Sequence, residues 1–427
     1  MKKNTAFYPG DILIPKEHLR PRFSVVACDQ FTSQPDYWAE TAALAEGHPS
    51  ALHMILPEAL LGRVDEEARI AAAKETMDWY LRDGLFDCLP QSFVYLERTL
   101  RDGQVRRGLM GVLDLECYDY RKGSRTLVRP TEATVTQRIP PRMKLRQGAS
   151  LEMPHAMLLI DDPDCTVIEP LAARKEEFPC CYDFDLMQGG GHLKGWALPH
   201  SCYESVQPAL EKLADSKAFN QRLGTSRKPA ILCAVGDGNH TLAAARACWE
   251  ELRETLTEEE RACHPARWAL VELCNLHDPG VTFLPIHRAV FDVDPAHFRA
   301  ALLQWAETVP EGEKSLPTAK RQNFTLITGS REKKVSIKLP AHPLTVGSVQ
   351  GFLDRYLKKH GGRVDYIHGD DALRQLCREG TVGLLLPPMP KDALFYTVAT
   401  QGALPAKTFS IGEAWDKRYY LECRKIR

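Results

Sequence analysis

The order of apolar and polar residues predicts two helices and then a β-hairpin in the first part of the chain. Residues 35–46 and 64–83 have helix-forming sequences, and the second helix ends at Gly84, which readily takes the left-handed backbone of a helix stop. Apolar residues dominate 93–100 and 105–116, on either side of an Asp-Gly dipeptide. That dipeptide accepts the positive φ angles of a tight turn, so the two segments are expected to pair as antiparallel strands.

A basic segment and a strand that leads directly into a helix follow in the middle of the chain. Residues 121–148 are polar and basic, and Pro140 and Pro141 argue against a regular helix there, so an extended segment is expected. A continuous apolar run over 229–236 predicts a buried strand, and the helix formers of 241–256 predict a helix after it. The few residues between them form a tight turn.

The remaining elements alternate without a repeat of fixed period. Strands are predicted at 156–162, 268–276, 281–291 and 381–388, a hairpin over 323–338, and helices at 205–222, 296–307 and 347–360. This mixed order favours an α+β fold with mixed sheets over a doubly wound sheet. We expect a core lobe over residues 1–291 and a smaller C-terminal α/β lobe over residues 292–427, with one compact unit as the alternative.

Composition fits a folded globular protein and disfavours other classes. Apolar residues make up 44% and charged residues 26% of the 427, so disorder, collagen and coiled coil fit poorly. With 55 Lys and Arg against 56 Asp and Glu, the net charge of −1 gives no general reason to expect nucleic acid or a membrane as partner. The start lacks a signal peptide, no apolar run could cross a bilayer, and 13 scattered cysteines without a CxxC motif indicate cytosolic thiols. A cytoplasmic location is therefore expected.

The predicted turn carries the residues that point most directly to chemistry. Its sequence is Gly236-Asp237-Gly238-Asn239-His240-Thr241. Glycines allow close backbone approach, and the free N–H groups of a helix's first turn attract phosphate oxygens. Asp237 could hold a metal ion or take a proton from a hydroxyl, and His240 could donate to a phosphate oxygen. In the alternative, Asp237 and Asn239 only shape the turn while Thr241 caps the helix.

This turn matches neither GxxxxGK[ST] nor GxGxxG, the two standard phosphate motifs. Additional positive charge could come from the basic segment, where Arg129, Arg138 and Arg142 offer guanidinium groups that bind phosphates in bidentate fashion. Glu132 lies among these arginines. It is either a general base for a hydroxyl nucleophile or an ion-pair partner.

Two further polar residues and three cysteines carry weaker expectations. Asp29 follows the predicted strand 23–28, and the carboxyl end of a strand is a common place for ligand contacts. His155 lies three residues after Glu152 without completing a metal motif. Buried, inert thiols are expected for the cysteines of apolar runs, which are Cys28, Cys233 and Cys274.

Six segments, taken in order, resemble a large bacterial and archaeal family catalogued as a domain of unknown function. They are residues 27–33 (ACDQFTS), 129–135 (RPTEATV), 152–155 (EMPH), 236–243 (GDGNHTLA), 276–279 (LHDP) and 285–288 (PIHR). The family carries a signature close to Asp-Gly-His-His-Arg, which is similar to loops of the ParB and sulfiredoxin superfamily and its free-serine kinases. The resemblance implies a ParB/sulfiredoxin-like core, in which that loop binds ATP or CTP or transfers a phosphoryl group to a small hydroxyl.

Three residues match that signature directly, namely Asp237, Gly238 and His240. Glu132 matches a glutamate that follows a basic residue and a histidine in many members of the family. The resemblance therefore implies that these four residues belong to the nucleotide site, with catalytic roles for Glu132, Asp237 and His240.

Two positions depart from the signature. Asn239 stands where the first histidine is expected, and Thr241 stands where an arginine would contact phosphate. The chain must then either use another cation, such as Arg129, Arg142 or Arg246, or lack nucleotide turnover. Loss of a fixed guanidinium can cost about 2–4 kcal/mol of transition-state stabilisation.

The leading hypothesis is a nucleotide-dependent phosphotransferase that acts on a small hydroxyl substrate such as free serine. ATP or ADP with magnesium would rest on residues 236–241, and arginines of the basic segment would neutralise the phosphates. The alternative is a non-catalytic nucleotide sensor or regulatory protein of the ParB/sulfiredoxin type. A third hypothesis is an intracellular scaffold whose polar loop is only a turn.

Overall fold

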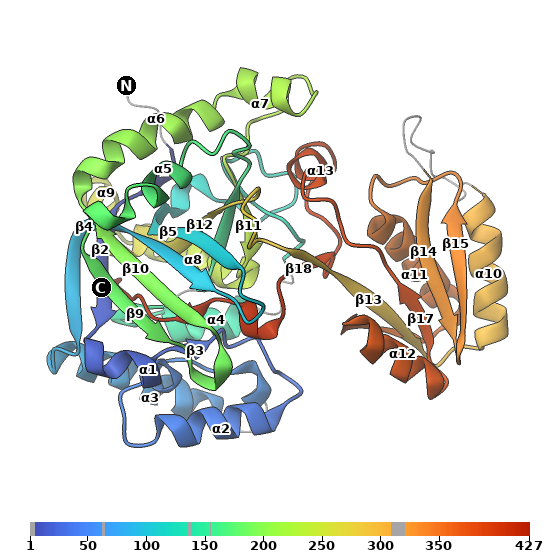
Figure 1. Cartoon of the computed structure of the whole chain (residues 1–427), viewed down its shortest axis with the longest axis horizontal. Helices are drawn as coiled ribbons and strands as arrows, with labels where there is room; N and C mark the ends of the chain where they lie inside the picture. Colours follow the sequence, from blue (N-terminus) through green and yellow to red (C-terminus); the bar gives the residue numbers. More distant parts are fainter. Residues whose placement is uncertain (1–4, 62–64, 135–138, 154, 309–320) are drawn as a thin grey trace. The chain divides into compact units, whose positions relative to one another are not determined.

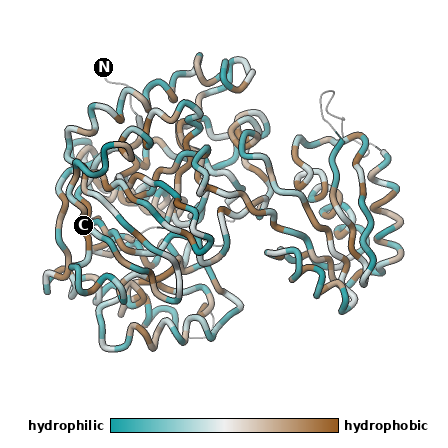
Figure 2. Tube along the Cα trace, in the orientation of Figure 1, coloured by the Kyte–Doolittle hydropathy of each residue, from teal (hydrophilic) through white to brown (hydrophobic). Residues whose placement is uncertain are grey.

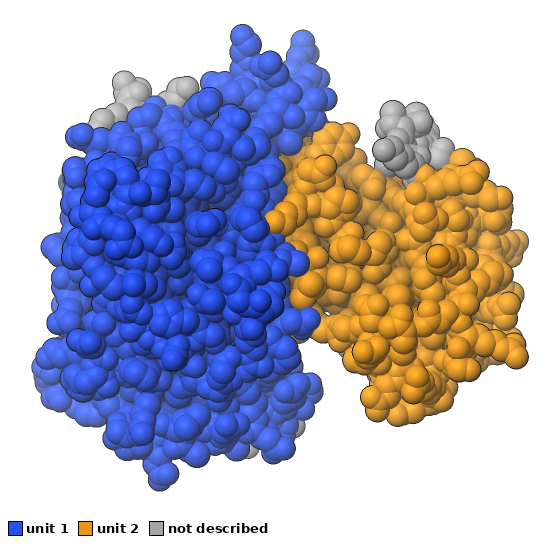
Figure 3. All heavy atoms as spheres, viewed as in Figure 1, with its two compact units in different colours: residues 1–282, 411–427 blue, residues 283–410 orange. Residues whose placement is uncertain are grey.

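The computed structural model describes residues 5–61, 65–134, 139–153, 155–308 and 321–427. The chain forms two compact units (Figures 1 and 3). The first comprises Met1–Thr282 and Ile411–Arg427, and the second comprises Phe283–Ser410.

A large mixed sheet forms the centre of the first unit. Its main strand order is β6-β11-β8-β12-β5-β4-β10-β9, with β1 beside β5 and β2 beside β4. The strands are β1 (Phe7–Tyr8), β2 (Gly10–Pro15), β4 (Phe86–Thr99), β5 (Val105–Asp114), β6 (Val128–Pro130), β8 (Met157–Ile160), β9 (Cys180–Asp185), β10 (His192–Leu198), β11 (Cys233–Asp237) and β12 (Trp268–Asn275). Most neighbours are antiparallel, but β11 is parallel to β6 and β12 is parallel to β8. The expected α+β fold with mixed sheets is confirmed.

Helices cover both faces of this sheet. They are α1 (Arg20–Phe23), α2 (Pro35–Ala45), α3 (Glu66–Arg82), α4 (Ile139–Arg146), α5 (Glu169–Ala172), α6 (Tyr203–Leu213), α7 (Ser216–Arg222), α8 (Asn239–Arg253) and α9 (Glu258–Cys263). Successive residues of a strand point to opposite faces, so Val94 packs in a cluster with α2 and α3 while Tyr95 packs in a cluster with α6 and α8. Figure 2 shows hydrophilic and hydrophobic positions interspersed along the chain, as expected where elements bury one face.

Several local predictions are confirmed in this unit. Helices α2 and α3 lie within one or two residues of their predicted bounds, and β4 pairs with β5 around the predicted turn, with Thr99 opposite Val105. The predicted helix over 205–222 is two helices, because α6 ends at Leu213 and Asp215 caps α7 by accepting hydrogen bonds from the N–H groups of Lys217 and Ala218.

The predicted extended conformation of residues 121–148 is wrong for part of that segment. It contains the short strand β6, but α4 begins at Ile139 and runs through both prolines to Arg146. Pro140 and Pro141 lie in the first turn of α4. Proline is tolerated there because these positions have no intrahelical acceptor for an N–H group.

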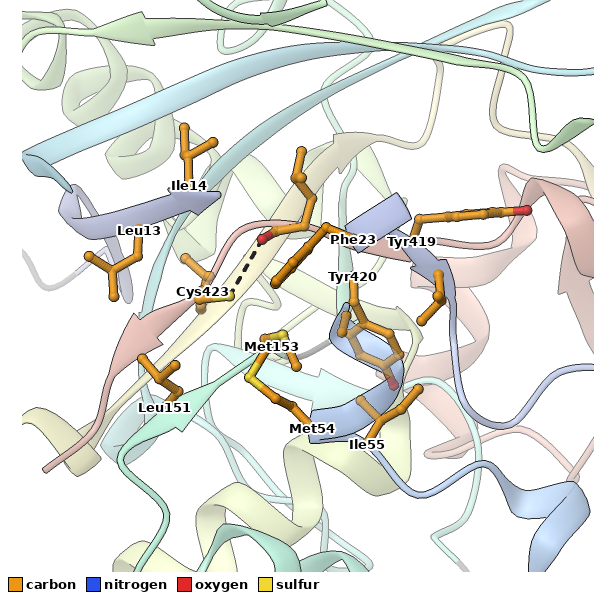
Figure 4. Close-up of a cluster of buried hydrophobic side chains, with 14 of the residues drawn as sticks. Leu13, Ile14, Phe23, Met54, Ile55, Leu151, Met153, Tyr419, Tyr420 and Cys423 are labelled. Atoms are coloured by element: carbon orange, nitrogen blue, oxygen red, sulfur yellow. Dashed lines mark hydrogen bonds between the residues drawn. The ribbon is translucent and has the colours of Figure 1, made fainter. Parts of the chain in front are cut away.

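The last 17 residues return to the first unit. Strand β19 (Tyr419–Tyr420) pairs with β3 (Val25–Val26), and β20 (Arg424–Lys425) pairs with β7 (Leu151–Glu152). Figure 4 shows Tyr420 and Cys423 among apolar side chains from the first part of the chain, including Leu13 and Phe23.

The second unit has its own mixed α/β structure. Its sheet contains strands in the order β15-β14-β17-β13-β16. Its elements are β13 (Phe283–Phe291), α10 (Pro295–Glu307), β14 (Gln322–Thr328), β15 (Arg331–Ile337), α11 (Thr345–His360), β16 (Arg363–His368), α12 (Asp370–Arg378), β17 (Val382–Leu385) and α13 (Ala393–Gln401), after which β18 (Phe409–Ile411) leads back to the first unit. The predicted α10, α11, β17 and hairpin are present, whereas α12 and α13 were not predicted.

The division of the chain differs from the expected lobes. The expected core lobe ended at residue 291, but β13 lies in the second unit, and the expected C-terminal lobe ran to residue 427, but residues 411–427 lie in the first unit. The return depends on contacts between distant segments, such as the ion pair of Arg418 with Glu272, which local patterns do not reveal. No described helix has the length and apolarity needed to cross a membrane.

Candidate functional site

The turn between β11 and α8 forms as the glycine pattern predicts. Strand β11 ends at Asp237, and Gly238 precedes the first residue of α8 with a left-handed φ of 75°. A Cβ atom at Gly238 would lie 2.7 Å from the Cα atom of Ala156. Glycine is therefore needed here both for the backbone conformation and for the close approach of the neighbouring chain.

This turn leaves helix N–H groups at a surface that solvent can reach. Gly238 donates its N–H to the Asp237 Oδ1 atom at 2.9 Å, and the first helical bond runs from Leu242 N–H to Gly238 O at 3.0 Å. The positions between them have no intrahelical acceptor, and the positive end of the helix dipole lies at this point. Asp237, Asn239, His240 and Thr241 are each half-buried, so the corner is not sealed inside the protein.

The neighbouring strand β6 brings Glu132 to the same edge of the sheet. Strands β6 and β11 are parallel, with Pro130 opposite Val235, so their carboxyl ends meet. The Thr131 hydroxyl donates to Val235 O at 2.6 Å, and the Asn239 amide donates to the same oxygen at 3.3 Å. Glu132 follows Thr131 directly and is half-buried. The structure thus brings together the sequence-predicted Glu132, Asp237 and Asn239.

A lysine from the C-terminal segment completes this corner. The Lys417 Nζ atom lies 3.6 Å from the Asp237 Oδ2 atom, and Lys417 is only 7% exposed. An ammonium group with so little solvent interacts strongly with nearby negative charge. Lys417 thus supplies a cation beside the turn, where Thr241 replaces the expected arginine.

The buried His155 and the half-buried Asp29 form a pair beside the turn. The His155 Nε2 atom lies 3.6 Å from Asp29 Oδ2, and its Nδ1 atom lies 3.0 Å from the Tyr420 hydroxyl. Strand pairing of Met157 with Asp237 places this histidine, two residues earlier, next to the turn.

The pKa values of the pair shift in opposite directions. Burial lowers the pKa of His155, but the charge of Asp29 outweighs this effect, with a further contribution from Asp237, so that the pKa lies above its ordinary value. Burial raises the pKa of Asp29, but the charge and hydrogen bond of His155 hold that pKa well below its ordinary value. The two residues therefore favour a carboxylate and an imidazolium.

A cavity of about 120 Å³ adjoins the start of α8. Its polar lining includes Cys28, Glu58, Arg142, Thr241 and Tyr420, and the rest is largely apolar. Arg142 of α4 forms an ion pair with Glu58, and the charge of Glu58 raises the pKa of Arg142 against the lowering effect of burial. Arg142 thus lines a space that begins at the predicted phosphate-binding turn.

Cys233 and Cys274 are buried as expected, whereas Cys28 is half-buried. Burial raises the pKa of Cys28 to about 12, and it also raises the pKa of Cys233 and of Cys274. A thiolate nucleophile is therefore not favoured at any of these positions.

The other predicted arginines do not reach the turn. The Arg129 guanidinium donates to the backbone oxygens of Thr126, Pro229 and Ala230, which precede β6 and β11, so the group lies at the opposite end of both strands. Arg246 donates to Leu115 O and pairs with Glu116. Arg138 lies outside the described residues.

Sequence reasoning missed Lys417 and Tyr420 and did not connect Asp29 with His155. Asp29, His155 and the segment that carries Lys417 and Tyr420 are each more than 100 positions apart along the chain, so no local pattern shows that they lie together. Among the residues that the structure describes, no group of three or more His, Cys, Asp or Glu could hold a metal ion.

The sequence of this chain also matches a known protein family. Residues 13–356 match the family described as "Protein of unknown function (DUF1015)". The chain belongs to the DUF1015 family. This match confirms the family resemblance that the six sequence segments indicated. Comparison with curated proteins gives no match.

Several solved structures are similar to part of this chain. Three of them have the following low sequence identities and TM-scores. A free serine kinase in complex with AMP is 11% identical, with a TM-score of 0.35 over 74% of this chain and 90% of the other. A conserved hypothetical protein from Pyrococcus furiosus is 12% identical, with a TM-score of 0.33 over 74% of this chain and 94% of the other. SbnI from Staphylococcus aureus with a C-terminal truncation is 10% identical, with a TM-score of 0.35 over 70% of this chain and 81% of the other.

Proposed function

We propose that this protein is a nucleotide-dependent phosphotransferase whose acceptor is a small hydroxyl compound. The observation that carries the proposal is the half-exposed turn of residues 236–241, where Asp237 lies beside the nearly buried ammonium group of Lys417. Phosphoryl transfer depends mainly on positioning and on stabilising negative charge, and this corner offers groups for both.

The nucleotide phosphates would rest on the N–H groups at the start of α8. Lys417 would then provide the positive charge that Thr241 cannot, and His240 would donate to a phosphate oxygen. Arg142, which lines the adjoining cavity, is the second available cation. Arg129 and Arg246 are excluded from this role because their guanidinium groups bind elsewhere.

Magnesium would arrive with the nucleotide. Mg²⁺ is usually held by one or two carboxylates together with substrate phosphates, and the Asp237 carboxylate at the end of β11 would supply one such ligand. When bound, the ion would neutralise charge on the phosphates.

Glu132 is the residue to which we assign the acceptor's proton. Asp237 is engaged by Gly238 N–H and Lys417, and Glu132 lies beside it at the carboxyl end of the neighbouring strand β6. The acceptor oxygen would form a bond to the γ-phosphorus as the bond to the β,γ-bridging oxygen breaks, and the hydroxyl proton would pass to the Glu132 carboxylate. The charged Asp29–His155 pair would position the acceptor.

Nucleotide titration followed by a product assay tests this function. ATP, ADP and CTP with magnesium are titrated against the purified protein by calorimetry, and L-serine is then added to the ATP complex while ³¹P NMR follows the formation of a phosphate monoester. Free serine is the first acceptor because a free serine kinase is among the similar structures. Binding and a new ester support the proposal, and absence of nucleotide binding overturns it.

The second candidate is a nucleotide sensor without turnover. Thr241 and Asn239 replace two residues expected in the family signature, and this observation favours it. In that case the same titration gives nucleotide binding, but no ester forms with serine or with a panel of other small alcohols.

A further inference from the structure

Four cations gather at the end of β6 and β11 that lies opposite the turn. Arg125 precedes β6, Arg227 and Lys228 precede β11, and Lys217 belongs to α7. Together they line a groove of about 660 Å³ in the first unit. Helices α6 and α7 run along this edge of the first unit (Figure 1).

The positive charge of this groove is not compensated. Its other lining residues are Ser, Asn, Gln, Thr and Pro, so it contains no carboxylate. Within the described residues, none of the four cations forms an ion pair, whereas nearby Arg121 and Arg222 pair with Glu250 and Asp161. In a chain with a net charge of −1, such a concentration of one sign attracts an oppositely charged ligand.

A fifth cation lies behind the groove. Arg129 is 6% exposed and donates to Pro229 O and Ala230 O, at the start of β11. Burial, together with the charge of Arg125, lowers the pKa of Arg129 to about 10. The positive charge of Arg125 thus acts on the buried Arg129 and is not neutralised there.

One side chain holds the groove in shape. The Asn220 amide donates to Ser216 O at 2.7 Å and to Lys228 O at 2.8 Å, while its Oδ1 atom accepts from Lys228 N–H and from the Thr225 hydroxyl, each at 2.9 Å. Three of these bonds, those to Thr225 and Lys228, join α7 to the loop that carries Arg227 and Lys228. A ligand would therefore meet an ordered set of cations and would not have to order the loop itself.

The lining also indicates the kind of anion. The groove contains no aromatic side chain, and single-stranded nucleic acids usually need such side chains for base stacking. Its volume falls in the range of small-molecule sites, roughly 300–1,000 Å³. Arginine forks and lysine ammonium groups within one small groove suit several phosphate groups carried close together.

We propose that this groove is a second ligand site, separate from the 236–241 turn, that binds a small anion carrying several linked phosphates. Inorganic tripolyphosphate is the probe. Calorimetric titration compares the natural protein with Arg125→Gln/Arg227→Gln, which removes two groove charges. Arg331→Gln/Lys333→Gln, which removes two exposed charges from β15, is the matched control, and Lys417→Gln tests the turn.

The tripolyphosphate affinity of the groove should fall about tenfold or more in Arg125→Gln/Arg227→Gln and change little in the control pair. Because the turn is itself proposed to hold phosphates, a loss in Lys417→Gln would report probe bound at the turn and not in the groove. Circular dichroism should show the groove variant and the control pair folded, because the residues substituted in both are exposed. Equal affinity of the groove variant and the control pair would overturn the proposal. An unstructured DNA oligonucleotide that binds the groove while tripolyphosphate does not would also overturn it.

Discussion

The two ends of the parallel strands β6 and β11 carry their charges in contrasting ways. At the carboxyl end, Asp237 lies beside Lys417, and the paired Asp29 and His155 lie next to them. At the amino end, the four groove cations have no carboxylate among them and face an open groove.

This contrast separates two tasks that charged residues perform. Buried groups of opposite charge fix one another's protonation state and position, as reaction chemistry requires. Exposed groups of one sign bind an anion through their summed field but have nothing to accept or deliver a proton. On this basis we assign chemistry to the carboxyl end and anion recognition to the amino end.

The largest expected effect is that of Asp237→Asn on phosphoryl transfer. The amide keeps an acceptor for Gly238 N–H but removes the negative charge beside Lys417. The rate constant kcat should fall by about 10³-fold, which corresponds to about 4 kcal/mol of barrier. Steady-state kinetics measures the loss, and thermal unfolding checks the fold. If the variant unfolds instead, Asp237 is a structural residue, and the assignment of chemistry to the carboxyl end of the strands is wrong.

Two glycines, one near each end of the strands, give the next comparison. Gly238 and Gly224 both have left-handed φ angles, but an added Cβ would collide with Ala156 at Gly238 and meet nothing within 4 Å at Gly224. Gly238→Ala should lower the free energy of unfolding by about 2–4 kcal/mol through conformational strain and overpacking.

Gly224→Ala is the matched control, with an expected loss of about 1 kcal/mol from the backbone conformation alone. Urea denaturation of both variants measures the difference. Equal losses would show that the contact between Gly238 and Ala156 does not constrain the turn.

A smaller effect concerns the Asp29–His155 pair and its pH dependence. The raised pKa of His155 means that its stabilising contribution is fully present below about pH 6.5 and is lost as pH rises through the raised pKa. The lowered pKa of Asp29 means that its contribution is present above about pH 3.8 and is lost as pH falls through the lowered pKa.

Asp29→Asn should therefore cost about 1–2 kcal/mol between these pH values, and the difference from the natural protein should shrink as pH rises above 6.5. Denaturation curves recorded at several pH values measure this difference. A cost that does not change with pH would show that the pair is not ionised in the folded protein.

Local sequence patterns predicted the fold where neighbouring residues determine it. The turn at Gly238 could be predicted because a strand, two glycines and a helix follow one another directly, and the β4–β5 hairpin because Asp102-Gly103 lies between two apolar segments. Helix α4 was missed because Pro140 and Pro141 were interpreted as breakers, although both fit the first turn of a helix.

The site was predicted in part for the same reason. Asp237 and Glu132 belong to recognisable segments, but Lys417 reaches Asp237 only because residues 411–427 fold back onto the first unit. Arg129 was a candidate because of its charge alone. The direction of its side chain depends on hydrogen bonds to the carbonyl groups of Pro229 and Ala230, about 100 residues away along the chain. Sequence shows which residues carry charge but not where their side chains point.

Calorimetric measurement of ADP binding in the presence of magnesium tests the central claim most directly. The natural protein is compared with variants at each end of strands β6 and β11. If nucleotide phosphates bind at the turn, Lys417→Gln should weaken ADP binding about tenfold or more, Lys417→Arg should restore most of it, and Arg125→Gln/Arg227→Gln should leave it nearly unchanged. No ADP binding by the natural protein, or a loss confined to the groove variant, would contradict the account.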